Sequence, residues 1–126
     1  MISYEKLYKT AQGMLDRAYA PYSGFHVAAA LQTADGKVYT GVNVENATYG
    51  ATICAERTAA VTAVAAGSRE FVAIAIVSSG GAAMPCGICR QFLAEFCEDM
   101  DVITGDDVES LHVYKLSELI PYTFKL

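Results

Sequence analysis

The run FVAIAIVSS at residues 71–79, almost wholly apolar, limits most strongly how this chain can fold. A run of this kind predicts a strand whose two faces are both buried. Such a strand lies inside a sheet that helices cover on both sides. Helical patterns precede and follow it, at residues 3–19, at about 54–66 and at 86–98. The chain is therefore expected to adopt an α/β fold, a three-layer α-β-α sandwich.

Four further segments complete a mixed five-stranded sheet in this prediction. They are residues 26–33, 37–44, 101–105 and 111–116. The dipeptide Asp35-Gly36 separates the first two and is typical of a tight turn between antiparallel strands. Residues 117–126 predict a short helix followed by an aromatic tail.

The composition favours a single domain over residues 1–126 that acts on a small neutral molecule. Apolar residues make up 53% and charged residues 18%, so the chain can bury a core, and other subunits are expected to cover part of its surface. The net charge is −5 and no basic stripe occurs, which argues against nucleic acid as a partner. No apolar run reaches 18 residues and the N-terminus is unlike a signal peptide, so we expect no membrane partner and a cytoplasmic location.

Three cysteines and a glutamate have the spacing of a metal site. Cys86 and Cys89 form a C-x-x-C pair at the start of one predicted helix, and Cys54 opens another, with Glu56 two positions on. In a cytoplasmic protein, cysteines stay reduced and serve metals or catalysis. Three thiolates leave the fourth tetrahedral position of zinc free for water, the pattern of a catalytic site. A C-x-x-C pair alone is equally compatible with a redox or buried role, and Cys97 is expected in the core rather than at the metal.

Three long stretches identify a family resemblance. FHVAAAL, GVNVENATYGATICAERTAA and PCGICRQFLAEF resemble the short, homotetrameric, zinc-dependent cytidine deaminases, and the similarity covers residues 4–124. The resemblance implies a cytidine deaminase-like fold, one zinc ion per subunit held by Cys54, Cys86 and Cys89, and Glu56 as the proton shuttle. It also implies deamination of cytidine and deoxycytidine to uridine and deoxyuridine, with release of ammonia, in pyrimidine salvage.

The chemistry explains why these groups are needed. Zinc lowers the pKa of water so that hydroxide becomes available near neutral pH. Glu56 can take the proton from that water and deliver it to N3 of the cytosine ring, which makes C4 electrophilic. The same carboxyl group then carries a proton to the departing amine, and ammonia leaves.

Three thiolates around Zn²⁺ carry a net charge of −1, and two features can offset it. The cysteines lie at or near predicted helix N-termini, where the helix dipole favours negative charge. Arg57 lies three positions after Cys54, so its guanidinium can reach the thiolate. By resemblance Arg57 does so, and Gln91 supports the cluster as well. The alternative for Arg57 is a solvated surface charge.

The resemblance also implies the substrate contacts. Asn43 and Glu45 match the pair that holds the ribose 3′-hydroxyl, and Phe25 matches the aromatic residue that stacks on the pyrimidine. The Ala55 backbone N–H and Glu56 would bind the edge of the base. Two more aromatic residues match positions that reach the pocket from neighbouring subunits. These are Tyr49 and Phe124.

Two alternatives remain open from the sequence. A deaminase of a cytosine nucleoside antibiotic such as blasticidin S shares the CAE and PCG-C-RQ patterns. A structural-zinc or redox module would use the same cysteines without catalysis. One departure from the family is Met84, where Ser or Thr is common, and it bears on substrate affinity if a hydroxyl matters there.

Overall fold

The computed structural model describes residues 1–126, and its centre is a five-stranded sheet in the order β2-β1-β3-β4-β5. The strands are β1 (Val27–Thr33), β2 (Val38–Val42), β3 (Phe71–Ser78), β4 (Asp101–Gly105) and β5 (Leu111–Lys115). The pair β3–β4 is parallel and the other neighbouring pairs are antiparallel, so the sheet is mixed. The apolar run at residues 71–79 is the middle strand, as its pattern predicts.

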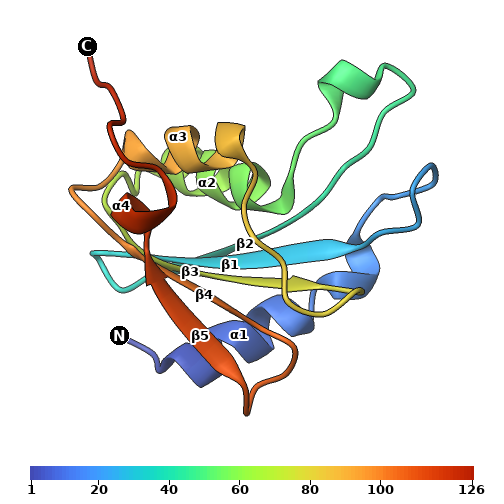
Figure 1. The fold of residues 1–126 in the computed structure, drawn as a ribbon, viewed down its shortest axis with the longest axis horizontal. Helices are drawn as coiled ribbons and strands as arrows, with labels where there is room; N and C mark the ends of the chain where they lie inside the picture. The colour runs from blue at the N-terminus through green and yellow to red at the C-terminus, as the bar shows by residue number, and fades with distance from the viewer.

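Helices cover both faces of this sheet. Helix α1 (Tyr4–Gln12) packs on one face, and α2 (Ala55–Ala65) and α3 (Gly87–Ala94) pack on the other, as Figure 1 shows. Neighbouring residues of β1 alternate between the two layers: Ala30 belongs to the cluster with Leu7 of α1, and Leu31 to the cluster with Ala59 of α2. The three-layer α-β-α sandwich is confirmed.

A glycine in β2 lets α2 approach the sheet closely. A Cβ atom on Gly41 would lie 2.3 Å from the backbone nitrogen of Ala59 and 2.6 Å from the carbonyl oxygen of Ala55. The backbone of α2 therefore rests directly on β2. This contact fixes the distance between the sheet and the first turn of α2, where Glu56 lies.

The hairpin and the helix boundaries show what local sequence decides. Gly36, with φ +85°, donates its N–H to the Thr33 carbonyl, so the predicted turn is present. The first helix ends at Gln12 rather than near residue 19, because Gly13 caps it and a short 3₁₀ helix, Leu15–Arg17, follows. Likewise α3 ends at Ala94, where the Leu93 carbonyl accepts the N–H of Phe96 in a tighter turn; beyond the helix, the Phe96 carbonyl accepts the N–H of Phe71.

The remaining elements are short. A 3₁₀ helix, Tyr49–Ala51, interrupts the loop before α2, and α4 (Leu116–Leu119) precedes the C-terminal tail. None of the helices has both the length and the apolar character needed to cross a membrane.

Candidate metal centre and active site

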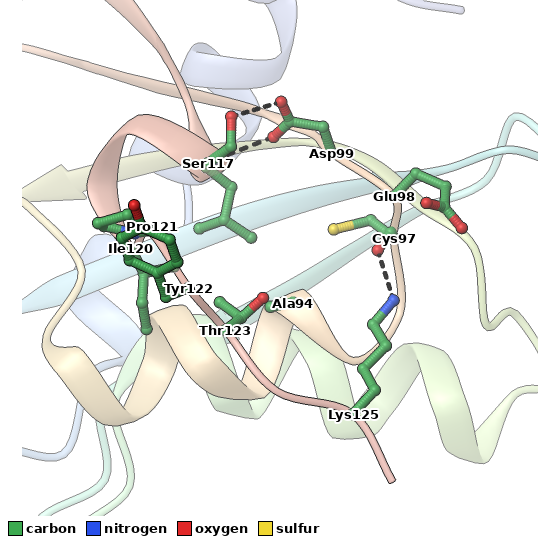
Figure 2. A pocket seen from close by; sticks show the side chains of 11 residues that line it. Ala94, Cys97, Glu98, Asp99, Ser117, Ile120, Pro121, Tyr122, Thr123 and Lys125 are labelled. Atoms are coloured by element: carbon green, nitrogen blue, oxygen red, sulfur yellow. Dashed lines mark hydrogen bonds between the residues drawn. The ribbon is translucent and has the colours of Figure 1, made fainter.

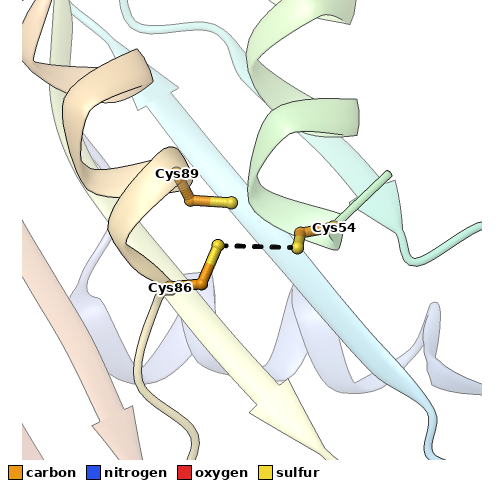
Figure 3. A group of neighbouring side chains, drawn as sticks. All are labelled: Cys54, Cys86 and Cys89. Atoms are coloured by element: carbon orange, nitrogen blue, oxygen red, sulfur yellow. Dashed lines mark hydrogen bonds between the residues drawn. The ribbon is translucent and has the colours of Figure 1, made fainter. Parts of the chain in front are cut away.

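The N-termini of α2 and α3 meet, and they bring three cysteines together. Cys54 is the N-cap of α2, Cys86 is the N-cap of α3, and Cys89 lies in the first turn of α3. Figure 3 shows the three side chains converging from the two helix ends. Their sulfur atoms all lie within 4.8 Å of one another, and Cys54 and Cys86 are 3.8 Å apart. The sequence predicted this group, and the fold assembles it.

The cluster fits zinc on its own geometry and chemistry. Zn–S bonds of about 2.3 Å at a tetrahedral angle place two sulfur atoms about 3.8 Å apart, which matches the Cys54–Cys86 separation. All the cysteines are free thiols. Cys97 donates its S–H to the Leu93 carbonyl at 3.5 Å, outside the cluster, and burial raises the pKa of its thiol to about 11. The donor set is thus three sulfur atoms, and a fourth tetrahedral position is left for water.

Hydrogen bonds distribute charge unevenly within the cluster. The bond to Cys89, and then the bond from Arg57, lower the pKa of Cys54 to about 5 against the effect of burial. Nη2 of Arg57 donates to the Cys54 sulfur at 3.6 Å. The same pairing with Cys54, together with burial, raises the pKa of Cys89. Arg57 thus provides the nearby positive charge that the spacing predicts.

Glu56 combines burial with a position beside the thiols. It lies in the first turn of α2 and is 4% exposed. Burial raises the pKa of its carboxyl group to about 7, and the negative charge of Cys54 acts in the same direction. A carboxyl group with this pKa can both accept and release a proton near neutral pH.

A cavity of about 230 Å³ opens against Glu56 and two of the cysteines. Its lining residues are mostly apolar: Phe25, Val27, Asn43, Thr52, Cys54, Ala55, Glu56, Ile76, Ala83, Met84 and Cys86. A small, mainly apolar cavity with a few polar groups at one end is typical of a site for a small planar molecule. The structure therefore brings Phe25, Asn43, Ala55 and Glu56 together around one space.

Asn43 has a structural role as well as a place in the cavity wall. Its amide nitrogen donates to the Phe25 carbonyl at 2.8 Å, and its amide oxygen accepts the Val27 N–H at 2.9 Å. These two bonds fix the backbone on either side of residue 26. One side chain thus holds the segment that carries Phe25 while it borders the cavity.

Glu45 lines a second cavity of about 290 Å³ rather than the first one. Thr52 borders both cavities, so the two are neighbours. The Glu45 carboxylate accepts the backbone N–H groups of Tyr22 at 2.9 Å and Ser23 at 3.1 Å, as well as the Ser23 hydroxyl. These bonds, that of the Ser23 hydroxyl first, lower the pKa of Glu45. These bonds therefore hold the carboxylate in place in the cavity next to the one that Glu56 lines.

The two aromatic residues expected to reach neighbouring subunits are highly exposed in the single chain. Tyr49 is 75% exposed and lines the second cavity, where its ring meets Tyr22 edge-on at 5.8 Å. Phe124 is 67% exposed, and its carbonyl accepts a hydrogen bond from Nε2 of Gln91 at 3.1 Å. Neither Gln91 nor Phe124 lines the 230 Å³ cavity of its own chain.

Three contacts at the site involve residues that the sequence did not single out. Ser23 holds Glu45, Gly80 faces the ring of Phe25, and Arg90 donates from Nε to the Pro85 carbonyl at 2.7 Å. Small loop residues such as Ser23 and Gly80 give no signal beyond that of a turn. The available signal for Arg90 is its place directly after the C-x-x-C pair.

Comparison with known proteins identifies the family to which this chain is similar. The family model for the cytidine and deoxycytidylate deaminase zinc-binding region matches residues 1–105. A cytidine deaminase of Halalkalibacterium halodurans is 45% identical over 122 residues, which cover 95% of this chain and 92% of that protein. A cytidine deaminase of Sporosarcina psychrophila is 46% identical over 117 residues, with 89% and 86% covered.

Solved structures agree with these relatives. The crystal structure of cytidine deaminase from Burkholderia pseudomallei has a TM-score of 0.90 at 43% identity, covering 98% of this chain and 100% of that chain. The structure of cytidine deaminase from Mycobacterium tuberculosis has a TM-score of 0.86 at 36% identity, with 100% of both chains covered. Sequence, fold and the three-cysteine cluster lead to one conclusion: this chain belongs to the cytidine deaminase family of hydrolases.

Proposed function

We propose that the protein catalyses the zinc-dependent hydrolytic deamination of cytidine and deoxycytidine to uridine and deoxyuridine, with release of ammonia, and so serves pyrimidine salvage. One observation carries this proposal. A buried carboxyl group, Glu56, lines the same cavity of about 230 Å³ as two of the three converging thiols. A structural or redox cysteine cluster needs neither the carboxyl group nor the cavity.

Cys54, Cys86 and Cys89 hold one zinc ion per subunit in this proposal. When bound, zinc supplies Lewis-acid activation of water near neutral pH. Arg57 offsets the excess negative charge of the thiolates through its bond to Cys54. Gln91 supports the cysteine cluster indirectly, by holding the Phe124 carbonyl of the C-terminal tail.

Glu56 moves the protons of the reaction. Its carboxylate accepts a proton from the attacking water and delivers it to N3 of the pyrimidine, which makes C4 electrophilic. After attack at C4, the same group takes the proton of the new C4 hydroxyl and passes it to the exocyclic nitrogen; the C4–N bond then breaks, the C4 carbonyl forms and ammonia leaves. A pKa near the working pH suits a group that has to accept and donate in one cycle.

The cavity walls supply the substrate contacts. Phe25 offers a ring face for the pyrimidine, and the Ala55 N–H and Glu56 bind the edge of the base. Asn43 and Glu45 bind the ribose, with the ionised Glu45 accepting the 3′-hydroxyl hydrogen. A carboxylate at this end repels a phosphate, so the proposed substrate is a nucleoside and not a nucleotide.

Neighbouring subunits complete the site in this proposal. The exposed rings of Tyr49 and Phe124 close the pockets of adjacent copies in a homotetramer, and this burial would remove two large aromatic surfaces from water. The four free thiols suit the reducing conditions of the cytoplasm.

The test is release of uridine and ammonia from cytidine by the zinc-loaded protein. Glu56→Gln keeps the shape of the side chain but cannot shuttle protons, so we expect kcat to fall at least about a hundredfold with zinc content unchanged. Glu109→Gln changes an exposed carboxyl group outside the site and serves as the matched control. Chelation should abolish activity, and zinc should restore it.

Two outcomes would favour the alternatives. Faster turnover of blasticidin S than of cytidine would identify an antibiotic nucleoside as the substrate. No turnover of either compound by protein that carries zinc would mean that the cluster is structural or redox-active.

A further inference from the structure

Hydrogen bonds from side chains to main-chain carbonyls hold α4 and the C-terminal tail against α3 and the turn that follows it. Nη1 of Arg90 donates to the carbonyl of Leu119, the last residue of α4, at 2.6 Å, and Nε2 of Gln91 donates to the Phe124 carbonyl at 3.1 Å. Nζ of Lys125 donates to the Cys97 carbonyl, beyond the end of α3, at 3.0 Å. The end of α4 and the tail are therefore fixed at three separate points.

Between these points the tail has little apolar packing. Residues 121–126 are all exposed, and Tyr122 has the left-handed φ of +58°. A cavity of about 510 Å³ separates this segment from α3 and α4, and Figure 2 shows Lys125 reaching across it to Cys97. Within the single chain, these hydrogen bonds are therefore the main contacts that hold the tail.

Arg90 differs from the other two anchors because it also contacts the metal-binding loop. Its Nε donates to the Pro85 carbonyl at 2.7 Å, while its Nη1 holds the Leu119 carbonyl. Pro85 is buried and directly precedes Cys86. One planar guanidinium thus bridges the end of α4 and the residue next to a thiol.

Cys86 is the thiol that depends most on such a bridge. Cys89 is buried and Cys54 is half-buried, whereas Cys86 is exposed. Packing therefore does little to fix the Cys86 side chain. The Pro85–Cys86 peptide plane sets the direction from which the Cys86 sulfur enters the cluster, and the bond from Arg90 holds the carbonyl oxygen of that plane.

We propose that Arg90 is a positioning residue that couples the end of α4, from which the C-terminal tail departs, to the metal centre by holding the Pro85 and Leu119 carbonyls with one guanidinium. The inference rests on the zinc site of the proposed function and adds a residue to it. We expect a displacement of α4 at Leu119 to move the loop that carries Cys86. Lys125, which holds the tail to Cys97 beyond the end of α3, has no such connection.

Three variants distinguish the effect of the two-carbonyl bridge from the effect of the positive charge and from that of a loosened tail. Arg90→Gln removes both the positive charge and the planar guanidinium that holds the two carbonyls. Arg90→Lys keeps the charge but cannot hold two carbonyls with one planar group. Lys125→Ala loosens the tail and leaves the Pro85 carbonyl untouched. Each protein is loaded with zinc, and release to an excess of a coloured chelator is followed; folding is verified by circular dichroism.

We expect both Arg90 variants to release zinc about tenfold faster than the wild type, as is usual when a group behind a metal ligand is lost. The Lys125 variant should release zinc at the wild-type rate. Cobalt-loaded Arg90 variants should also show altered thiolate-to-cobalt absorption bands, a signature that loss of stability alone does not produce.

The outcomes distinguish the two levels of the proposal. Wild-type release rates and cobalt spectra in the Arg90 variants would overturn the coupling while the zinc site stands. Restoration by lysine would assign the effect to charge and overturn the bridge. Equal acceleration in Lys125→Ala would assign it to the tail in general. A wild type that binds no zinc would overturn both this inference and the proposed function.

Discussion

Gly80 faces the ring of Phe25 so closely that a Cβ atom on residue 80 would lie 2.9 Å from Cε1 of that ring. Ordinary carbon–carbon contacts are about 3.5–4.0 Å, so the ring has to shift if residue 80 gains a side chain. Because Phe25 lines the 230 Å³ cavity, the size of residue 80 controls the shape of that cavity.

Gly80→Ala should therefore weaken substrate binding more than the chemical step. We expect KM for cytidine to rise about threefold to tenfold, from the loss of about 1 kcal/mol of ring contact, with kcat little changed. Steady-state kinetics measure the separate effects on KM and kcat. Gly13→Ala is the control, since its Cβ would meet only ordinary contacts at 3.6 Å, far from the cavity. An unchanged KM in Gly80→Ala would mean that the ring does not contact the substrate.

Glu45→Gln tests the ribose contact with a pair of substrates. The amide can still accept the N–H groups of Tyr22 and Ser23, but it lacks the charge that strengthens a bond from the 3′-hydroxyl. Since a hydrogen bond to a charged group contributes about 1–1.5 kcal/mol more than one to a neutral group, kcat/KM for cytidine should fall about fivefold to tenfold. With 3′-deoxycytidine, wild type and variant should be nearly equal. An equal loss on both substrates would place the effect in the loop and not in the ribose contact.

Gly41→Ala should destabilise the whole domain. The added methyl group would overlap the backbone of α2 at Ala55 and Ala59, which cannot move without lifting the helix off β2. We expect a loss of about 3 kcal/mol in the free energy of unfolding, seen as a lower urea midpoint with an unchanged m-value. Gly50→Ala, where a Cβ atom meets nothing within 4 Å, should keep the wild-type midpoint.

Asp35 should contribute stability that disappears in acid. Hydrogen bonds from the hydroxyl of Thr33, the hydroxyl of Ser68 and the N–H of Lys37 lower its pKa from 3.8 to about 2. A carboxyl group whose pKa is lower in the folded state than in the unfolded state stabilises the fold above the unfolded pKa. This contribution is lost as pH falls from about 4 towards 2.

The measurement compares wild type with Asp35→Asn, which keeps an acceptor oxygen in the hairpin. Over that pH range the free energy of unfolding should fall more steeply in the wild type. Because the carboxylate is exposed, high salt should shrink the difference. Parallel curves for the two proteins would show that Asp35 titrates alike in the folded and unfolded states.

The sheet was predictable because short-range patterns specify it. The apolar run at residues 71–79 requires cover on both faces, and Asp35-Gly36 specifies its own turn. For the cysteines, the C-x-x-C spacing pairs Cys86 with Cys89, whereas the family resemblance adds Cys54, which lies 32 positions before Cys86.

The remaining features depend on contacts between distant segments. Nothing in the local sequence says that Gln91 meets the Phe124 carbonyl, or that Ser23 holds Glu45. The predicted end of α3 was wrong for a related reason: the sequence predicts a helix up to residue 98, whereas α3 ends at Ala94 and the Phe96 carbonyl accepts the N–H of Phe71 in β3. Helix propensity does not reveal this contact with a distant strand.

The separation of the thiols along the chain has a consequence for turnover of the protein in the cell. Cys54 and Cys86 are 32 positions apart, and the segment between them contains α2 and the central strand β3. An ion held by both cysteines is then a reversible cross-link that closes a loop around the middle of the domain. On this view, zinc starvation would do more than silence the active site: it would open the loop, expose β3 to proteases and shorten the lifetime of the chain.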